Sequence, residues 1–272
     1  MTYGATTQYE RILEKRLGRR ESPEMRVAAI YDIHGNLPAL EAVLEEIRQE
    51  RVDRIVVGGD VVPGPMCREA LAHLLELKIP VQFIQGNCEV AVLEEMAGRD
   101  AGPMPQQARE SMRWTAQQLR PEYEKVLASW PKTVRLEIPG LGKVLFCHGT
   151  PRNENEIFTR STAEERLLPV FEGLNVAVVT CGHTHMQFDR WIGGVRVVNA
   201  GSVGMPFGEP GAYWLLLGPD VELRQTRYDL TKAAERIRDS NYPQAEDFAE
   251  NYVLHPPAEK KMLEVFARVE LK

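Results

Sequence analysis

Four of the six histidines in this chain directly follow apolar segments that have the composition of buried β-strands. They are His34 in IYDIHGN, His148 in VLFCHGT, and His183 and His185 in CGHTH. Imidazole nitrogen is the commonest metal ligand among side chains, and it suits divalent transition metals. Histidines placed where buried strands end therefore predict a metal centre on the rim of a sheet. His183 and His185 could share one ion, or a loop could aim them at different ions.

Three oxygen donors follow strand-like segments in the same way. Asp32 lies two residues before His34, and side chains two residues apart on a strand share a face, so both can point at one ion. Asp60 follows a double glycine in IVVGGD, which lets its two oxygens approach closely and bridge two cations. Asn87 in FIQGN offers a neutral carbonyl oxygen.

Together these donors predict a site for two divalent transition-metal ions, which are Mn, Fe, Zn or Ni rather than Mg or Ca, and Mn is favoured among them. Two such ions about 3.5–4 Å apart would share a hydroxide that attacks a bound phosphate in line. A protein nucleophile is then unnecessary, and the sequence contains no GxSxG elbow, Walker loop or GxGxxG motif. The candidate metal ligands are Asp32, His34, Asp60, Asn87, His148, His183 and His185.

The elements that must position these residues alternate between strand and helix. Strand-like and helix-like segments repeat about every 25–30 residues in the first 100, which indicates a parallel sheet with right-handed crossovers. Farther along, two strands joined by a tight turn precede another helix and a series of short strands. The principal expected elements are strands at 27–31, 53–59, 81–86, 133–138, 143–148 and 176–181, and helices at 37–50, 67–78, 89–98, 106–129 and 161–173.

We expect a single domain over residues 25–272, with a core at 25–230 and C-terminal helices at 231–272. Residues 1–24 stand apart as a polar extension with the basic stretch RILEKRLGRR. This extension is either a solvated segment or an arm for nucleic acid or membrane.

Composition narrows the class of protein. The chain has 272 residues, is 43% hydrophobic and carries a net charge of -6, which argues against nucleic acid as a partner. Its four cysteines form no CxxC pair, as expected in a reducing cytoplasm. No apolar run approaches the roughly 20 residues of a membrane helix, and no signal peptide is evident. We expect a cytoplasmic protein that does not bind membranes.

Five segments resemble the successive signature blocks of the calcineurin-like metallophosphoesterase superfamily. They are DIHGN, GGDVVPGP, GNCE, HGT and GHTH, and their order and spacing match across roughly residues 25–230. DIHGNLPALEAVL and the cysteine after GN resemble the small single-domain, phosphodiesterase-like branch of bacteria and archaea. The resemblance implies an α/β fold: a four-layer α/β/β/α sandwich of two mixed β-sheets flanked by helices, to which the sequence adds a helical C-terminal tail.

The resemblance also implies how the ligands divide between the ions, with one carboxylate shared. One ion would be held by Asp32, His34, Asp60 and His185, and the other by Asp60, Asn87, His148 and His183.

Cys88 marks a departure from many family members, which have at this position a histidine thought to protonate the leaving group or orient the phosphate. A neutral thiol is a poor general acid near pH 7, so we expect diester-like or activated substrates to be favoured. Glu89 is one methylene longer than the aspartate common in the family, and we expect it to make a hydrogen bond that supports the site.

Other polar residues have two interpretations. Asn36 either contacts phosphate or caps the following helix, and Arg152 either contacts substrate or lies in a solvated loop. His73 and His255 are expected to be structural.

The function expected from the sequence is hydrolysis of a small organophosphate, preferably a phosphodiester or nucleotide, by a dinuclear metal-dependent phosphoesterase. The alternatives are a non-catalytic binding or scaffold protein on the same fold, and a nuclease. The expected partner is the small phosphoester substrate, and the chain could also form a homo-oligomer.

Overall fold

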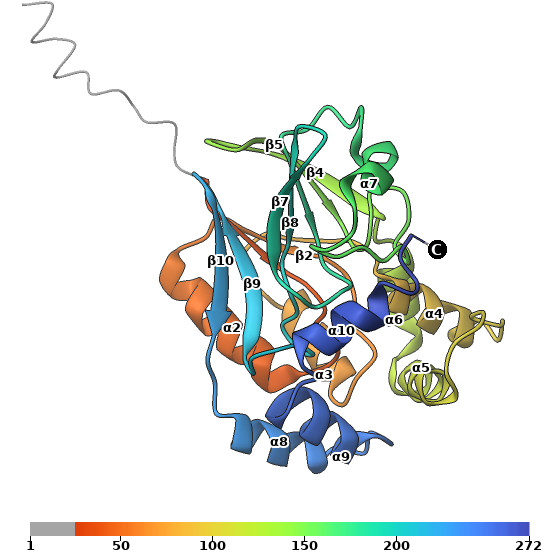
Figure 1. Ribbon diagram of the computed structural model, residues 1–272. Helices are drawn as coiled ribbons and strands as arrows, with labels where there is room; N and C mark the ends of the chain where they lie inside the picture. The colour runs from red at the N-terminus through yellow and green to blue at the C-terminus, as the bar shows by residue number, and fades with distance from the viewer. Residues whose placement is uncertain (1–24, 272) are drawn as a thin grey trace, which may run out of the picture.

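The computed structural model describes residues 25–271, so the expected extension at residues 1–24 lies outside the described residues. Two five-stranded mixed sheets form its centre (Figure 1). In the first sheet the strand order is β10-β9-β1-β2-β3; β1, β2 and β3 are parallel, and β9 runs antiparallel to β1 and β10. Its strands are β1 (Val27–Ile30), β2 (Arg54–Val57), β3 (Val81–Phe83), β9 (Ala212–Leu217) and β10 (Val221–Thr226).

The second sheet has the order β4-β5-β6-β8-β7. Strands β5, β6 and β8 are parallel, while β4 and β7 pair antiparallel at the two edges. The expected pair of strands joined by a tight turn is confirmed as β4 and β5. The strands of this sheet are β4 (Thr133–Ile138), β5 (Gly142–Cys147), β6 (Val178–Cys181), β7 (Phe188–Ile192) and β8 (Val195–Asn199).

Helix α2 (Leu37–Glu50) has the bounds expected from the sequence. A proline is tolerated in its first turn, because the backbone N–H groups there have no partner within the helix. Arg51 ends the helix in a left-handed conformation (φ 53°). The expected helix at 106–129 divides in two at Leu119–Arg120. The other helices before the tail are α3 (Cys67–Leu75), α4 (Asn87–Met96), α5 (Gln106–Gln118), α6 (Pro121–Ala128) and α7 (Glu164–Phe171).

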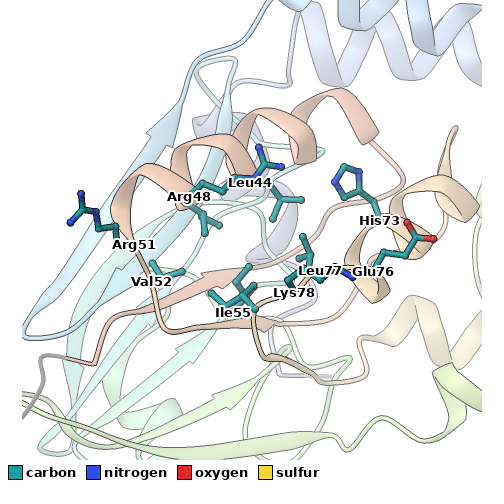
Figure 2. Close-up of a pocket in the computed structure, with 11 residues that line it drawn as sticks. Leu44, Arg48, Arg51, Val52, Ile55, His73, Glu76, Leu77 and Lys78 are labelled. Atoms are coloured by element: carbon teal, nitrogen blue, oxygen red, sulfur yellow. The ribbon is translucent and has the colours of Figure 1, made fainter.

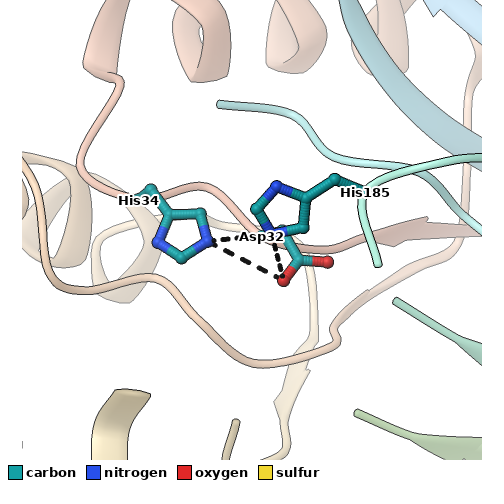
Figure 3. Close-up of side chains that lie close together, drawn as sticks. All are labelled: Asp32, His34 and His185. Carbon is teal, nitrogen blue, oxygen red and sulfur yellow. Dashed lines mark hydrogen bonds and ion pairs between the residues drawn. The ribbon is translucent and has the colours of Figure 1, made fainter. Parts of the chain in front are cut away.

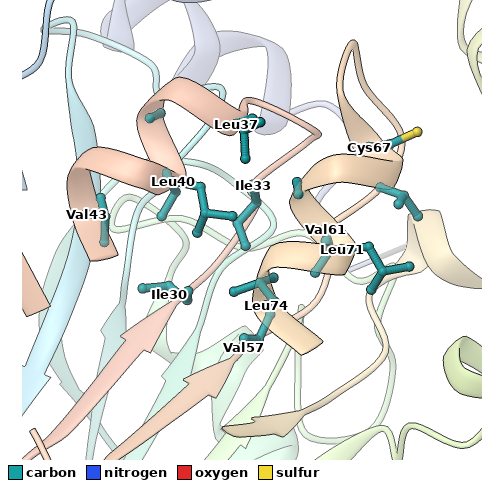
Figure 4. Packing of buried hydrophobic residues seen from close by; sticks show 14 of the residues in the cluster. Ile30, Ile33, Leu37, Leu40, Val43, Val57, Val61, Cys67, Leu71 and Leu74 are labelled. Carbon is teal, nitrogen blue, oxygen red and sulfur yellow. The ribbon is translucent and has the colours of Figure 1, made fainter. Parts of the chain in front are cut away.

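One face of the first sheet packs against helices. Alternation along β1 sends Ala28 and Ile30 into the apolar core under α2 and α3. Figure 4 shows side chains of these helices, among them Leu40 and Leu74, gathered above Ile30 and Val57.

The other face of the first sheet packs against the second sheet. Val27 and Ala29 of β1 share a buried cluster with Val144 and Phe146 of β5. The opposite face of β5 presents Leu145 and Cys147 to a cluster that includes residues of α7. The order is helices, sheet, sheet, helix, so the predicted four-layer α/β/β/α sandwich is confirmed.

The chain after β10 is helical, as expected. Its elements up to Leu254 pack against one another around a small apolar cluster, and breaks in the helices fall at Pro243 and at Pro256–Pro257. No helix in residues 25–271 is long and apolar enough to cross a membrane. The C-terminal elements are α8 (Leu230–Arg238), α9 (Ala245–Phe248), the π-helix η1 (Ala249–Leu254) and α10 (Glu259–Phe266).

Candidate metal centre

A first group of potential ligands consists of Asp32, His34 and His185, whose ligand atoms lie within 4.8 Å of one another (Figure 3). The Nε2 atoms of the two histidines are 3.2 Å apart, and Asp32 Oδ1 lies 3.3 Å from His185 Nε2. This Oδ1 atom is buried and has no hydrogen-bond partner. A buried carboxylate oxygen without a partner is costly, so the group has the chemistry of a cation site.

A second group consists of Asp60, His148 and His183. His148 Nε2 lies 3.4 Å from Asp60 Oδ2 and 3.0 Å from the side-chain oxygen of Asn87. Asp60 Oδ2 is also 3.8 Å from His34 Nε2 in the first group. One carboxylate oxygen therefore lies between a histidine of each group.

Backbone carbonyls orient three of the imidazoles. A carbonyl only accepts hydrogen bonds, so the ring nitrogen facing it carries a proton, and the other ring nitrogen is the one that can offer a lone pair to a metal. His148 Nδ1 donates to Gly58 at 2.9 Å, and His185 Nδ1 donates to Met205 at 2.6 Å. His183 donates from Nε2 to the carbonyl of Asn155 at 3.3 Å. Sequence reasoning missed these carbonyls, because any residue type can supply one.

The loops that carry the candidate ligands have an unusual backbone. Asp32, His34, Asp60, His183 and His185 all have positive φ, between 47° and 66°. The sequence argument placed two of them on a strand with alternating side chains, but β1 ends at Ile30. The side chains converge through left-handed loop residues instead. This conformation is uncommon outside glycine and is concentrated at functional sites.

Glu89 makes hydrogen bonds that support the site, as expected. It is fully buried, and its carboxylate accepts hydrogen bonds from the backbone N–H groups of Asp60, Val61, Val62 and Gly86 at 2.8–3.2 Å. The expectation of one supporting bond understated its role. The side chain ties the Asp60 loop to the start of α4.

The four histidines of the site fall into two pairs, one with lowered and one with raised pKa values. Burial lowers the pKa of His34 and of His183 to about 4 each, so both are neutral at physiological pH. Burial also opposes the charged form of His148, but the charges of Asp60 and Asp32 outweigh it and raise its pKa to about 10. For His185, burial is again outweighed by Asp32, and its pKa is raised.

Cys88 lies at the site. It is buried, and its sulfur is within 4.8 Å of ligand atoms of His34 and Asp60. Its backbone N–H donates to Asp60 Oδ1 at 2.9 Å.

Both residues proposed as substrate contacts have structural partners. The side-chain oxygen of Asn36 accepts from Ala39 N, which caps α2, and its amide donates to Gly204 O at 2.9 Å. Asn36 is also fully buried, so the structure favours the cap over a phosphate contact. Arg152 makes a two-pronged ion pair with Glu156, with its side chain half-exposed.

His73 and His255 lie outside both groups, as expected. His255 pairs with Glu250 at 2.9 Å on the surface. His73 lines a cavity of about 490 Å³ between α2 and α3 (Figure 2). None of the candidate ligands lines this cavity, whereas His34 lines another of about 300 Å³.

The fold and the site together define a metal-dependent phosphoric ester hydrolase. The chain belongs to the calcineurin-like phosphoesterase superfamily, whose domain model matches residues 25–218. Membership implies divalent metal ions, and the two groups of histidines and carboxylates fit that requirement.

Individual relatives are distant but similar over nearly their whole length. An uncharacterized protein of Methanocaldococcus jannaschii is 27% identical over 249 residues, which cover 80% of this chain and 94% of that protein. The crystal structure of a metallophosphoesterase from Sphaerobacter thermophilus has a TM-score of 0.65 at 27% identity, covering 84% of this chain and 97% of the other. A hypothetical protein from Pyrococcus horikoshii has a TM-score of 0.70 at 21% identity, covering 86% and 100%.

Proposed function

We propose that this protein is a dinuclear metal-dependent phosphodiesterase acting on a small organophosphate. The observation that carries the proposal is the position of Asp60 Oδ2, 3.4 Å from His148 Nε2 and 3.8 Å from His34 Nε2. A carboxylate between two groups of nitrogen ligands is suited to hold two cations close together. The unpaired oxygen of Asp32 adds a further anionic donor.

Each ion would have four protein ligands, with Asp60 common to both. When bound, the ions would activate water for attack and offset the charge of the phosphate. The chain's own residues hold the ligand nitrogens in the correct tautomers and keep the Asp60 loop in place through Glu89. The first ion would take Asp32, His34, Asp60 and His185, and the second Asp60, Asn87, His148 and His183. We propose manganese for both.

Cys88 supports a preference for diesters. It lies within 4.8 Å of the Asp60 and His34 ligand atoms, which is close enough to face the bound phosphate. A neutral thiol is a weak hydrogen-bond donor and a poor acid, so leaving groups that need protonation would be handled badly. A scaffold role is disfavoured, because every candidate ligand position carries a competent side chain.

Asp60→Asn tests the dinuclear site. The substitution removes the charge shared by both groups, so we expect loss of both metals and a fall in kcat of more than about 100-fold. Metal content by elemental analysis and hydrolysis of bis-4-nitrophenyl phosphate after manganese loading measure the effect.

Asp100→Asn is the matched control, because Asp100 is an exposed carboxylate paired with Arg109. It should leave both readouts unchanged. Retention of two metals and of activity by Asp60→Asn would overturn the assignment.

A further inference from the structure

A cavity of about 300 Å³ adjoins the candidate metal centre, and we call it the aromatic pocket. His34 belongs to its wall, so the cavity opens directly beside one group of metal ligands. Most of the remaining wall comes from two distant parts of the chain, the start of α5 and the segment 242–252 around α9 and η1, and Pro63 and Met205 supply the rest. Its volume lies at the lower end of the range for small-molecule sites.

The inner surface of the pocket consists mainly of aromatic rings and methionine side chains. Tyr242 and Phe248 meet edge to face, with centroids 6.3 Å apart, and Phe248 and Tyr252 are 5.7 Å apart. Met112 and Met205 complete the apolar wall. Aromatic rings and thioethers are the surfaces on which flat organic groups pack well.

The polar part of the wall determines which flat group fits. Gln107 and Gln244 supply amides, and Asp247 supplies a carboxylate. No lysine or arginine is among the described residues that line the pocket. A second phosphate or another anion would therefore have no counter-charge and would face Asp247. An uncharged group with hydrogen-bonding edges suits this wall.

The wall is held in place by its own contacts. The Tyr242 hydroxyl is 2.7 Å from Ser111 Oγ, and Trp114 packs edge-on against the same ring at 5.1 Å. Gln244 donates to the carbonyl of Gln107 at 2.8 Å, which joins the tail to α5. The pocket is thus formed before any ligand binds, so binding need not order it.

We propose that the aromatic pocket binds an uncharged planar group on one ester oxygen of the substrate. A nucleobase is the common biological group with that chemistry. The inference rests on the proposed function, because the phosphate of the same diester would lie at the metal centre. It narrows the substrate class to phosphodiesters that carry one nucleoside, and it excludes a second charged phosphate from the pocket.

Two diesters with the same leaving group test the proposal. Methyl 4-nitrophenyl phosphate has only a methyl group to offer the pocket, whereas the 4-nitrophenyl ester of thymidine 5′-phosphate offers a nucleobase. We expect the manganese-loaded protein to have the higher kcat/KM for the nucleoside diester. In Tyr252→Ala the kcat/KM for the nucleoside diester, relative to that for the methyl diester, should fall about tenfold. The reason is that alanine removes an aromatic ring on which the base would stack.

A second pocket variant and a control variant outside the pocket complete the experiment. Ala108→Trp fills the pocket from α5 and should lower the same ratio, even if Tyr252→Ala folds poorly. Trp191→Ala removes an exposed aromatic ring on β7, outside the pocket, and should leave the ratio unchanged. Equal kcat/KM values for the two diesters, or a parallel loss of both in the pocket variants, would overturn the proposal.

Binding of thymidine alone separates this inference from the proposed function. Saturation-transfer NMR on the metal-free protein should show contact with the base protons, and Tyr252→Ala should weaken it. If methyl 4-nitrophenyl phosphate is hydrolysed but thymidine does not bind, the pocket proposal fails and the phosphodiesterase stands. If thymidine binds but neither diester is hydrolysed, the proposed function fails instead.

Discussion

At the scale of single residues, the site concentrates buried carboxylates whose negative charge attracts either protons on the neighbouring histidines or metal ions. Asp32 Oδ1 has no hydrogen-bond partner, and its nearest polar neighbours include the Nε2 atoms of His185 and His148, at 3.3 and 3.8 Å. In the metal-free protein the carboxylates of Asp32 and Asp60 raise the pKa values of these two histidines, which favours their protonated forms. Protons and metal ions therefore compete for the same nitrogens.

Metal binding should consequently release protons. His148, with its pKa raised to about 10, is protonated at pH 7 and must lose a proton to bind a metal. Asp32 also raises the pKa of His185, which shifts that residue in the same direction. His34 and His183, with pKa values of about 4, are already neutral. Manganese affinity should therefore rise with pH through the neutral range, by about tenfold per unit for each proton displaced. Calorimetry in buffers of different ionisation enthalpy counts the protons.

His148→Gln should reduce the number of protons released, whereas His73→Gln, remote from the metal groups, should not. An affinity that does not change between pH 6 and pH 8 would contradict this assignment of charges.

Cys88→His tests the proposed substrate preference at the level of one side chain. An imidazole in this position can protonate a poor leaving group, which a neutral thiol does badly. We expect kcat/KM for phosphomonoesters to rise relative to that for matched diesters. A panel of paired mono- and diesters with the same leaving group measures the ratio, and an unchanged ratio would refute the role given to Cys88.

At the scale of elements, loops rather than strands shape the site. Left-handed residues are costly outside glycine, yet five of the seven candidate ligands adopt this conformation. Neighbouring glycines let the loops pack closely: a Cβ atom on Gly86 would collide with the Asp60 carboxylate, and one on Gly182 with that of Asp32. The strain is sustained because backbone hydrogen bonds hold each loop, including His34 N to Asp60 O at 2.9 Å.

Glu89→Gln should loosen two loops at once. The new amide would turn two hydrogens toward backbone N–H groups that now donate to a carboxylate. We expect a loss of about 2–4 kcal/mol in the free energy of unfolding, with weaker metal binding. Urea denaturation of the metal-free protein and metal titration measure the two effects.

Glu94→Gln on the same helix serves as control, because Glu94 makes an exposed pair with Arg99. Equal stability of the two variants would show that Glu89 does not hold the loops.

At the scale of the whole molecule, the helical tail returns to the metal centre. Phe207 stacks on the ring of His185 with centroids 5.1 Å apart, and Phe266 of α10 lies 6.1 Å from Phe207. The end of the chain is fastened beyond α10, where Leu271 N donates to Ile157 O at 2.9 Å. The tail thus covers one side of the site, and its segment 242–252 contributes part of the wall of the aromatic pocket.

Glu270→Ala should release this end of the chain. Glu270 is buried and accepts from Thr162 Oγ1 and from Arg166, both at 2.6 Å. Loss of these bonds should cost about 1–3 kcal/mol locally and speed proteolysis of the last helix. Limited proteolysis followed by mass spectrometry detects the change. Glu246→Ala breaks only an exposed pair with Arg238 and should not alter the rate; equal rates for both variants would argue against the fastening.

The sequence by itself determined the fold class and identified the candidate residues of the metal centre. Hydrophobic periodicity located α2 to the residue, and the residues after each apolar segment identified the candidate ligands, because burial and ligand chemistry are local properties. Two expectations stay predictions: that residues 25–272 form one domain, and that the protein forms a homo-oligomer.

Only the tertiary structure decided how those residues meet. Alternation on a strand suggested the correct neighbours, Asp32 and His34, for the wrong reason, since long-range contacts hold both in left-handed loop conformations. The carbonyls that orient the imidazoles and the helix-capping role of Asn36 depend on where the backbone passes. The aromatic pocket joins residues more than 130 positions apart, as the contact between Ser111 and Tyr242 shows. Such contacts arise from packing between distant segments, and no local pattern in the sequence encodes them.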